Sequence, residues 1–212
     1  LVVAYLENHF YPAALEKLSN ALQARGYHVL MFMAPNTTDS IDEVIEEILD
    51  YQVDGIIAAS VAMSSELSAR CRAAGVPMVL FNRSQDDPDM SAVTSDNHSG
   101  GRKVAAFLLA GGHRKIGYIA GWEGASTQRD RETGFCERLA EDGLSLHARG
   151  VGNFQMDTAA AAARAMFAND PPDAVFVAND HMAFAGVAVP RPARGLSGPG
   201  AARGGGAGAG QP

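Results

Sequence analysis

Short apolar runs alternate with segments of helical periodicity along the first 95 residues. In the first such segment, Ala14, Leu15, Leu18 and Leu22 fall on one face of a helix, because residues three or four apart share a face. Glycine follows several of these segments, at the position where helices commonly end. The pattern predicts buried strands at residues 1–6, 29–33, 56–59, 78–81 and 92–94, with helices between the first four.

The same alternation restarts after a turn-rich stretch at residues 95–101. It predicts helices at 102–110, 127–141, 158–167 and from 180 onward, and strands at 116–120, 148–152 and 174–178. Strands that alternate with helices are joined by right-handed crossovers, which produce parallel sheets. We therefore predict an α/β fold of two Rossmann-like lobes, the second incomplete. The N-terminal lobe is expected at residues 1–95 and the C-terminal lobe at residues 96–187.

Residues 188–212 depart from this pattern. They are rich in glycine, proline, alanine and arginine, and they contain no acidic residue. Such a composition cannot bury enough apolar surface to offset the entropy of ordering, so we expect a disordered tail. GC-rich codons encode these four residue types. Our hypothesis is that the coding sequence is truncated or frame-shifted here, and resequencing the gene in several isolates tests it.

Composition and charge exclude several classes of protein. Hydrophobic residues make up 47% of the chain and charged residues 19%, which is enough apolar material for a core. No apolar run approaches the roughly 20 residues of a membrane span. Two cysteines, Cys71 and Cys136, are too few for a disulfide scaffold and suit a reducing compartment. The net charge of −7 argues against bulk attraction of this chain to nucleic acid.

Polar and aromatic side chains gather where the predicted strands end. In parallel α/β sheets, ligands bind beyond the carboxyl ends of the strands. Arginine and asparagine pair with hydroxyls or carboxylates, and aromatic rings stack on sugars and bases. The sequence therefore favours a pocket for a small polar molecule. The residues at these strand ends are Asn8, His9, Phe10, Tyr11, Asn82, Arg83, Ser126, Thr127, Arg129, Arg131, Phe154, Asn179 and Asp180.

Several of these residues also have a simpler interpretation. Phe10 and Tyr11 could form a hydrophobic staple for the first helix. Arg131 could belong to a solvated charge cluster, Phe154 could lie in the core, and Asn179 could cap the following helix. Only the convergence of all these residues at strand ends favours the pocket.

Searches for catalytic and metal-binding patterns find nothing that supports an enzyme. The chain has no G-x-S-x-G nucleophile elbow and no H-E-x-x-H motif. Its six histidines include no pair four residues apart, and neither cysteine has a CxxC partner. We therefore predict a protein without catalytic residues, metal ion or cofactor.

Several segments, taken together and in order, resemble the effector-binding domain of bacterial transcriptional regulators of the LacI/GalR family. The resemblance runs from about residue 2 to residue 186. It rests on the sequences NHFY at 8–11, VDGII at 53–57, GVPMVLFNR at 75–83, SDN at 95–97, GHRKIGYIAG at 112–121, RxxGF at 131–135 and ANDHMA at 178–183.

The resemblance implies a periplasmic-binding-protein-like fold (type I) with an effector between two lobes, the first crossover lying near residues 94–97. It implies that Phe10, Tyr11 and Asn82 contact the effector from the first lobe. From the second lobe, Arg131 would clamp it with Ser126 or Thr127 nearby, Phe154 would stack, and Asn179 would hydrogen-bond. The second lobe would continue through a further helix and strand, which the residues after 187 do not resemble.

The function implied is that of a cytoplasmic repressor-type regulator without contact to a membrane. It would bind a sugar-like or purine-like effector and act as a homodimer. Operator DNA would be bound only by an N-terminal helix-turn-helix headpiece, which this sequence does not contain. The alternative is the sugar-binding receptor of an ABC importer, which shares the fold.

Overall fold

The computed structural model of the chain describes residues 1–4, 6, 8–34, 38–61, 65–85, 87 and 89–187. The tail predicted at 188–212 lies outside these residues. Strands and helices alternate along the described part of the chain. Their order is β1 (Val2–Val3), α1 (Phe10–Gln23), β2 (Phe32–Met33), α2 (Thr38–Asp50), β3 (Ile56–Ala59), α3 (Ser65–Ala73), β4 (Met78–Phe81), β5 (Ser91–Val93), α4 (Asn97–Ala110), β6 (Ile116–Ala120), α5 (Ser126–Glu141), β7 (Ala148–Val151), α6 (Met156–Ala168), β8 (Ala174–Val177) and α7 (Asp180–Val187).

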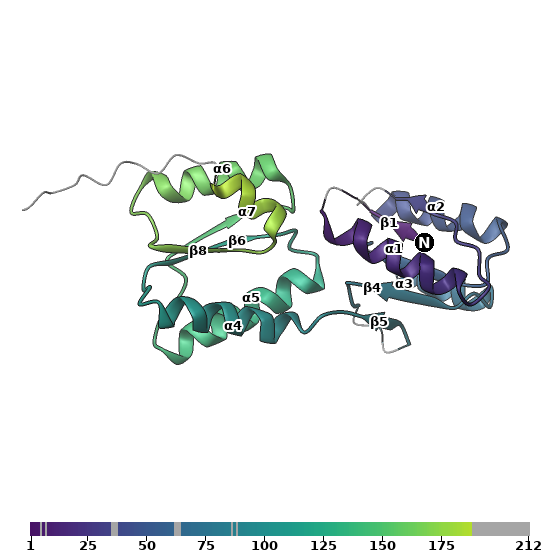
Figure 1. Cartoon of the computed structure of the whole chain (residues 1–212), viewed down its shortest axis with the longest axis horizontal. Coiled ribbons are helices and arrows are strands. Elements are labelled where there is room, and N and C mark those ends of the chain that lie inside the picture. The colour runs from purple at the N-terminus through teal and green to yellow at the C-terminus, as the bar shows by residue number, and fades with distance from the viewer. Residues whose placement is uncertain are drawn as a thin grey trace, which may run out of the picture.

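The strands form two separate parallel sheets. The first sheet has five strands in the order β2-β1-β3-β4-β5, and the second has three in the order β7-β6-β8. All strand pairs are parallel, with Ile56 opposite Met78 in the first sheet and Ile116 opposite Ala174 in the second. We call the elements up to β5 the first lobe and those from α4 to α7 the second lobe (Figure 1). The predicted α/β fold with parallel sheets is confirmed.

Helices cover both faces of the first sheet. Val2 packs with Ile45 of α2 and Leu67 of α3, whereas the adjacent Val3 packs with Leu15 of α1. Successive side chains of a strand point to opposite faces, which explains why neighbouring valines enter different clusters. The carboxyl ends of the strands are thereby left as the uncovered edge from which side chains can reach a ligand.

The second lobe is a layered sandwich of helices around its short sheet. In Figure 1, α6 and α7 lie on one side of β6 and β8, and α4 and α5 lie on the other. Three aromatic rings form the centre of its core: Tyr118 lies 5.7 Å from Phe135 and 5.3 Å from Phe176, between ring centroids. These rings anchor α5, which carries part of the pocket described below.

Helix α4 begins earlier than the sequence predicts. The sequence predicts a turn-rich stretch at residues 95–101, but the helix starts at Asn97. The side chain of Asp96 accepts a hydrogen bond from the amide of Ser99 at 3.0 Å. The glycine at 101 serves close packing against α5 instead. A Cβ there would lie 2.1 Å from the carbonyl oxygen of Arg131.

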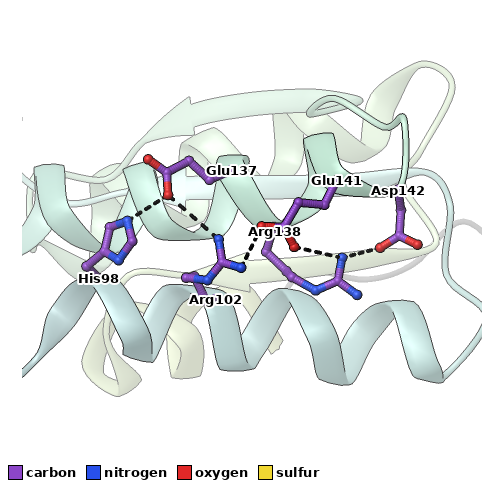
Figure 2. Close-up of polar contacts among 6 residues, drawn as sticks. All are labelled: His98, Arg102, Glu137, Arg138, Glu141 and Asp142. Carbon is purple, nitrogen blue, oxygen red and sulfur yellow. Dashed lines mark hydrogen bonds and ion pairs between the residues drawn. The ribbon is translucent and has the colours of Figure 1, made fainter.

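Ion pairs connect the solvent-facing sides of α4 and α5 (Figure 2). His98 contacts Glu137 at 2.8 Å, and Arg102 donates to Glu141 at 2.6 Å, so both pairs join the two helices. These side chains are largely exposed, and exposed pairs contribute only about 0–1 kcal/mol each. The close approach of the helices therefore depends on the backbone contact at glycine more than on these charges.

Candidate functional site

A pocket of about 220 Å³ lies between the two lobes, at the carboxyl ends of their strands. It is smaller than the roughly 300–1,000 Å³ typical of sites for drug-sized ligands, which suits a molecule the size of a single sugar ring. Amide, hydroxyl and guanidinium groups dominate its wall, together with three aromatic rings. The lining residues are Asn8, Phe10, Tyr11, Ser60, Asn82, Arg83, Ser95, Thr127, Arg131, Phe154 and Asn179.

Seven of the eight site residues predicted from the sequence line this pocket. The exception is Ser126, whose hydroxyl is buried and accepts a hydrogen bond from the backbone amide of Ser84 at 2.9 Å. The pocket thus brings together the predicted residues of both lobes, namely Phe10, Tyr11, Asn82, Thr127, Arg131, Phe154 and Asn179. Ligand binding by these residues stays a prediction.

On the first lobe, a hydrogen-bonded group forms the floor of the pocket. The hydroxyl of Tyr11, which is buried, accepts a hydrogen bond from Asn82 Nδ2 at 2.8 Å and also contacts the hydroxyl of Ser60. Phe10 is half-exposed, and its ring stacks on Phe81 with 6.0 Å between centroids. Tyr11 is therefore part of the framework of the site, whereas Phe10 presents a ring to the pocket.

Three lining residues have left-handed backbone conformations. Ser60, Asn82 and Phe154 have φ angles of +56°, +61° and +59°. Residues other than glycine rarely adopt this region, and such conformations are concentrated at functional sites, where the surrounding structure maintains them. Ser60 and Asn82 directly follow β3 and β4, so the backbone turns sharply at each strand end and directs the side chain into the pocket.

On the second lobe, Arg131 is held in place by neutral acceptors. Its guanidinium donates to Asn97 Oδ1 at 2.5 Å and to the carbonyl oxygen of Ala178. These two partners fix the orientation of the guanidinium at the pocket wall. Because both acceptors are uncharged, neither neutralises the positive charge of Arg131. The interpretation as a solvated charge cluster therefore does not hold for Arg131.

Asn179 combines the two roles that the sequence left open. Its Oδ1 accepts a hydrogen bond from the amide of Met182 at 2.8 Å, which caps α7, and the residue also lines the pocket. Because the cap uses the oxygen, the amide NH2 is the end of the side chain that can donate to a ligand.

A hydrogen-bonded network that runs from the core to the surface fixes the start of α5 against β6. Gln128 Oε1 accepts hydrogen bonds from the Tyr118 hydroxyl at 3.0 Å and from the Gly121 amide at 2.9 Å. Gln128 Nε2 donates to Glu132 at 2.8 Å, and Arg149 donates to the same carboxylate at 2.6 Å. Burial raises the pKa of Tyr118 above its ordinary value, so its hydroxyl stays protonated as the donor to Gln128 even in alkaline solution. The network holds the helix that carries Thr127 and Arg131.

Sequence reasoning missed two lining residues, Ser60 and Ser95, and did not single out Asn8 and Arg83 from the strand-end group. Ser60 follows the third strand and could have been found by applying the strand-end rule there. Ser95 directly follows the strand predicted at residues 92–94, on the connection between β5 and α4, so the same rule could have found it.

Within the described ranges, no group of three or more His, Cys, Asp or Glu side chains could hold a metal ion. In the same part of the chain, none of the helices has the length and apolar character that crossing a membrane requires.

Two parallel α/β lobes that meet at a polar pocket define the architecture of periplasmic-binding-protein-like domains. The chain belongs to the family of periplasmic binding proteins and sugar-binding domains of the LacI family, whose family model matches residues 1–204.

Relatives within this family include both regulators and transport receptors. The HTH-type transcriptional regulator CelR of Thermobifida fusca is 30% identical over 86% of this chain and 55% of its own length. The ribose import binding protein RbsB of Bacillus subtilis is 28% identical over 87% of this chain and 62% of its own. A solved CelR–cellobiose complex is 28% identical, with a TM-score of 0.77 over 88% of this chain and 60% of that one. The chain spans about half the length of the curated relatives it matches.

Proposed function

We propose that this chain is the effector-sensing domain of a bacterial transcriptional regulator of the repressor type. The observation that carries the proposal is the pocket between the lobes, lined from both sides by forked donors, amides and aromatic rings. A ligand that contacts both lobes binds one relative arrangement of the lobes better than the others, and it thereby raises the fraction of molecules in that arrangement. The same shift would alter operator binding by a headpiece outside this sequence.

The effector we propose is a small polar molecule, a sugar or a related metabolite such as a purine-like base. Phe10 and Phe154 provide ring faces, and Asn82, Arg131 and Asn179 provide polar groups. The relatives support a sugar, since one solved complex contains cellobiose and another relative is a ribose import binding protein. The protein would act without chemistry of its own, in the cytoplasm and as a homodimer.

A thermal-shift screen tests the effector directly. The chain would be melted with D-ribose, hexoses, cellobiose, sugar phosphates and nucleobases. A ligand at a hundred times its Kd stabilises by about 2.7 kcal/mol, which corresponds to a rise in Tm of about 5–11 °C for a chain of this size. A screen in which none of these compounds raises Tm at millimolar concentration would count against a small polar effector.

The second candidate is the sugar-binding receptor of an ABC importer, which the likeness to RbsB supports. The two candidates differ in what precedes residue 1 in the gene: a helix-turn-helix favours the regulator and a secretory signal favours the receptor. A fluorescence anisotropy assay with operator DNA and the full-length protein separates them functionally. Binding to DNA that changes with the effector is expected only of the regulator.

A further inference from the structure

The segment that follows Asn82 reaches across to the second lobe at two points. The guanidinium carbon of Arg83 lies 4.9 Å from the centroid of the Trp122 ring. The amide of the next residue, Ser84, donates to the hydroxyl of Ser126 at 2.9 Å. Two adjacent residues after β4 thus contact two positions of the second lobe, one just before α5 and one at its first residue.

One partner in each contact is buried. Arg83 is 5% exposed and Ser126 is 3% exposed, whereas Trp122 is partly buried and Ser84 is exposed. The Trp122 ring is also confined by its own loop, because a Cβ on Gly124 would lie 2.4 Å from the ring. A cation–π interaction is stronger when the cation is desolvated, and removing one partner of a buried hydrogen bond leaves the other partner unsatisfied.

The same segment borders the pocket. Arg83 and its neighbour Asn82 line the pocket on the first lobe, and Thr127, which follows Ser126, lines it on the second. A ligand in the pocket that contacts Arg83 therefore acts on a residue that already joins the two lobes.

We propose that Arg83 and Ser84 form a clasp with Trp122 and Ser126, which holds the two lobes together beside the pocket and sets the affinity for the effector. Arg83 is then a positioning residue that acts through the arrangement of the lobes. The effect on affinity rests on the proposed function, whereas the clasp itself does not.

Quenching of tryptophan fluorescence by acrylamide tests the clasp without any ligand. Trp122 is the only tryptophan of the 212 residues, so the emission reports on this contact alone. In Arg83→Leu the cation over the ring is lost. This variant should raise the quenching constant by up to about fivefold, the range that a cation–π contact supports.

The matched control is Arg25→Leu, which removes an exposed arginine from the first lobe and should leave quenching unchanged. Folding of each variant is checked by its thermal melt. If Arg83→Leu does not fold, Arg83→Gln decides the matter, because it removes the charge but keeps a polar side chain at the buried position. Quenching equal to wild type in a folded Arg83→Leu or Arg83→Gln chain refutes the clasp.

Titrations with D-ribose and cellobiose test the effect on affinity. Ser126→Ala removes one contact of the clasp without altering any lining residue, and its Kd should rise about two- to tenfold, the range of a single hydrogen bond. A Kd unchanged in Ser126→Ala but raised in Arg83→Leu would mean that Arg83 acts only by touching the ligand, which overturns the proposal. If neither sugar binds wild type, these two sugars are excluded as effectors and the titration is made with the compound that the thermal-shift screen identifies, while quenching still decides the clasp.

Discussion

Replacing Gly101 with alanine should destabilise the second lobe although alanine is the better helix former. The new Cβ would lie 2.1 Å from the carbonyl oxygen of Arg131 and 2.9 Å from the amide nitrogen of Phe135. Cβ atoms essentially never approach other atoms closer than 3.0 Å, so the helices must separate by about 1 Å at this contact. The obstacles are backbone atoms, which cannot rotate away as a side chain can.

The magnitude follows from two opposing effects. Overpacking of this kind costs about 3 kcal/mol at the upper end of its range, and the helix propensity of alanine returns about 1 kcal/mol. The net loss of about 2 kcal/mol corresponds to a fall in Tm of about 4–8 °C for a chain of this size. Because the obstructing carbonyl belongs to Arg131, affinity for the effector should fall as well.

Gly100 supplies the matched control, since it is adjacent in the same helix and a Cβ there would meet nothing within 4 Å. Gly100→Ala should therefore raise stability by about 0.5–1 kcal/mol. Thermal melts followed by far-UV circular dichroism measure both variants. A Gly101→Ala chain as stable as Gly100→Ala would refute the argument that the glycine is needed for backbone contact between α4 and α5.

Three further outcomes are expected. Gly121→Ala should weaken effector binding with little change in fold, because a Cβ there would lie 2.1 Å from the ring of Phe154 and displace it from the pocket. Isothermal titration measures the affinity, and an unchanged affinity would contradict this prediction. Arg131→Leu should raise the Kd for the effector about ten- to a hundredfold, as loss of a charged hydrogen bond does. Arg129→Leu, on the exposed side of α5, should leave the Kd unchanged. Equal effects of the two substitutions would argue against a clamp of Arg131 on the effector. Hydrogen bonds from the first turn of α4 hold the pKa of Asp96 below its usual 3.8 in the folded chain. The ionised carboxylate of Asp96 therefore stabilises the fold fully above pH 3.8, and this stabilisation is lost as the pH falls through the lower pKa of the folded state. Acid titration of wild type and Asp96→Asn measures this, and identical pH profiles would contradict it.

The sequence predicted most elements because local signals and tertiary structure agree in this chain. Gly26, with φ of +85°, donates to the carbonyl of Gln23, and the next amide bonds Leu22, which is the hydrogen-bond pattern of a glycine-terminated helix. Strands β3, β4 and β6 begin and end at the residues that the apolar runs indicate. Where a buried run is bounded by turn residues on both sides, the prediction needs no knowledge of the fold.

The differences have tertiary causes. Among the described residues of the strand predicted at 1–6, Val2–Val3 form β1, where the neighbours β2 and β3 are available for pairing. The start of α4 was missed because a glycine pair is typical of a turn, and only the presence of α5 explains a glycine inside a helix. Neither fact is encoded within a few residues of the chain.

For the site, the strand-end rule selected many of the residues that line the pocket but could not orient them. Ser126 and Thr127 are adjacent at the start of α5, and the sequence treats them alike. In the structure Thr127 lines the pocket, whereas Ser126 contacts Ser84. Successive residues of a helix point about 100° apart, so which of the two faces a ligand depends on the rotation of α5 about its axis, which the core sets.

The left-handed residues at the pocket restrict how its specificity can change. Positions 60, 82 and 154 accept glycine or asparagine without altering the backbone, but β-branched side chains would strain it. Thr127 and Arg131 lie on regular helix, where nearly any residue keeps the same backbone path. A designer who seeks a sensor for a new metabolite should therefore randomise the helical wall of the pocket and keep the strand ends fixed.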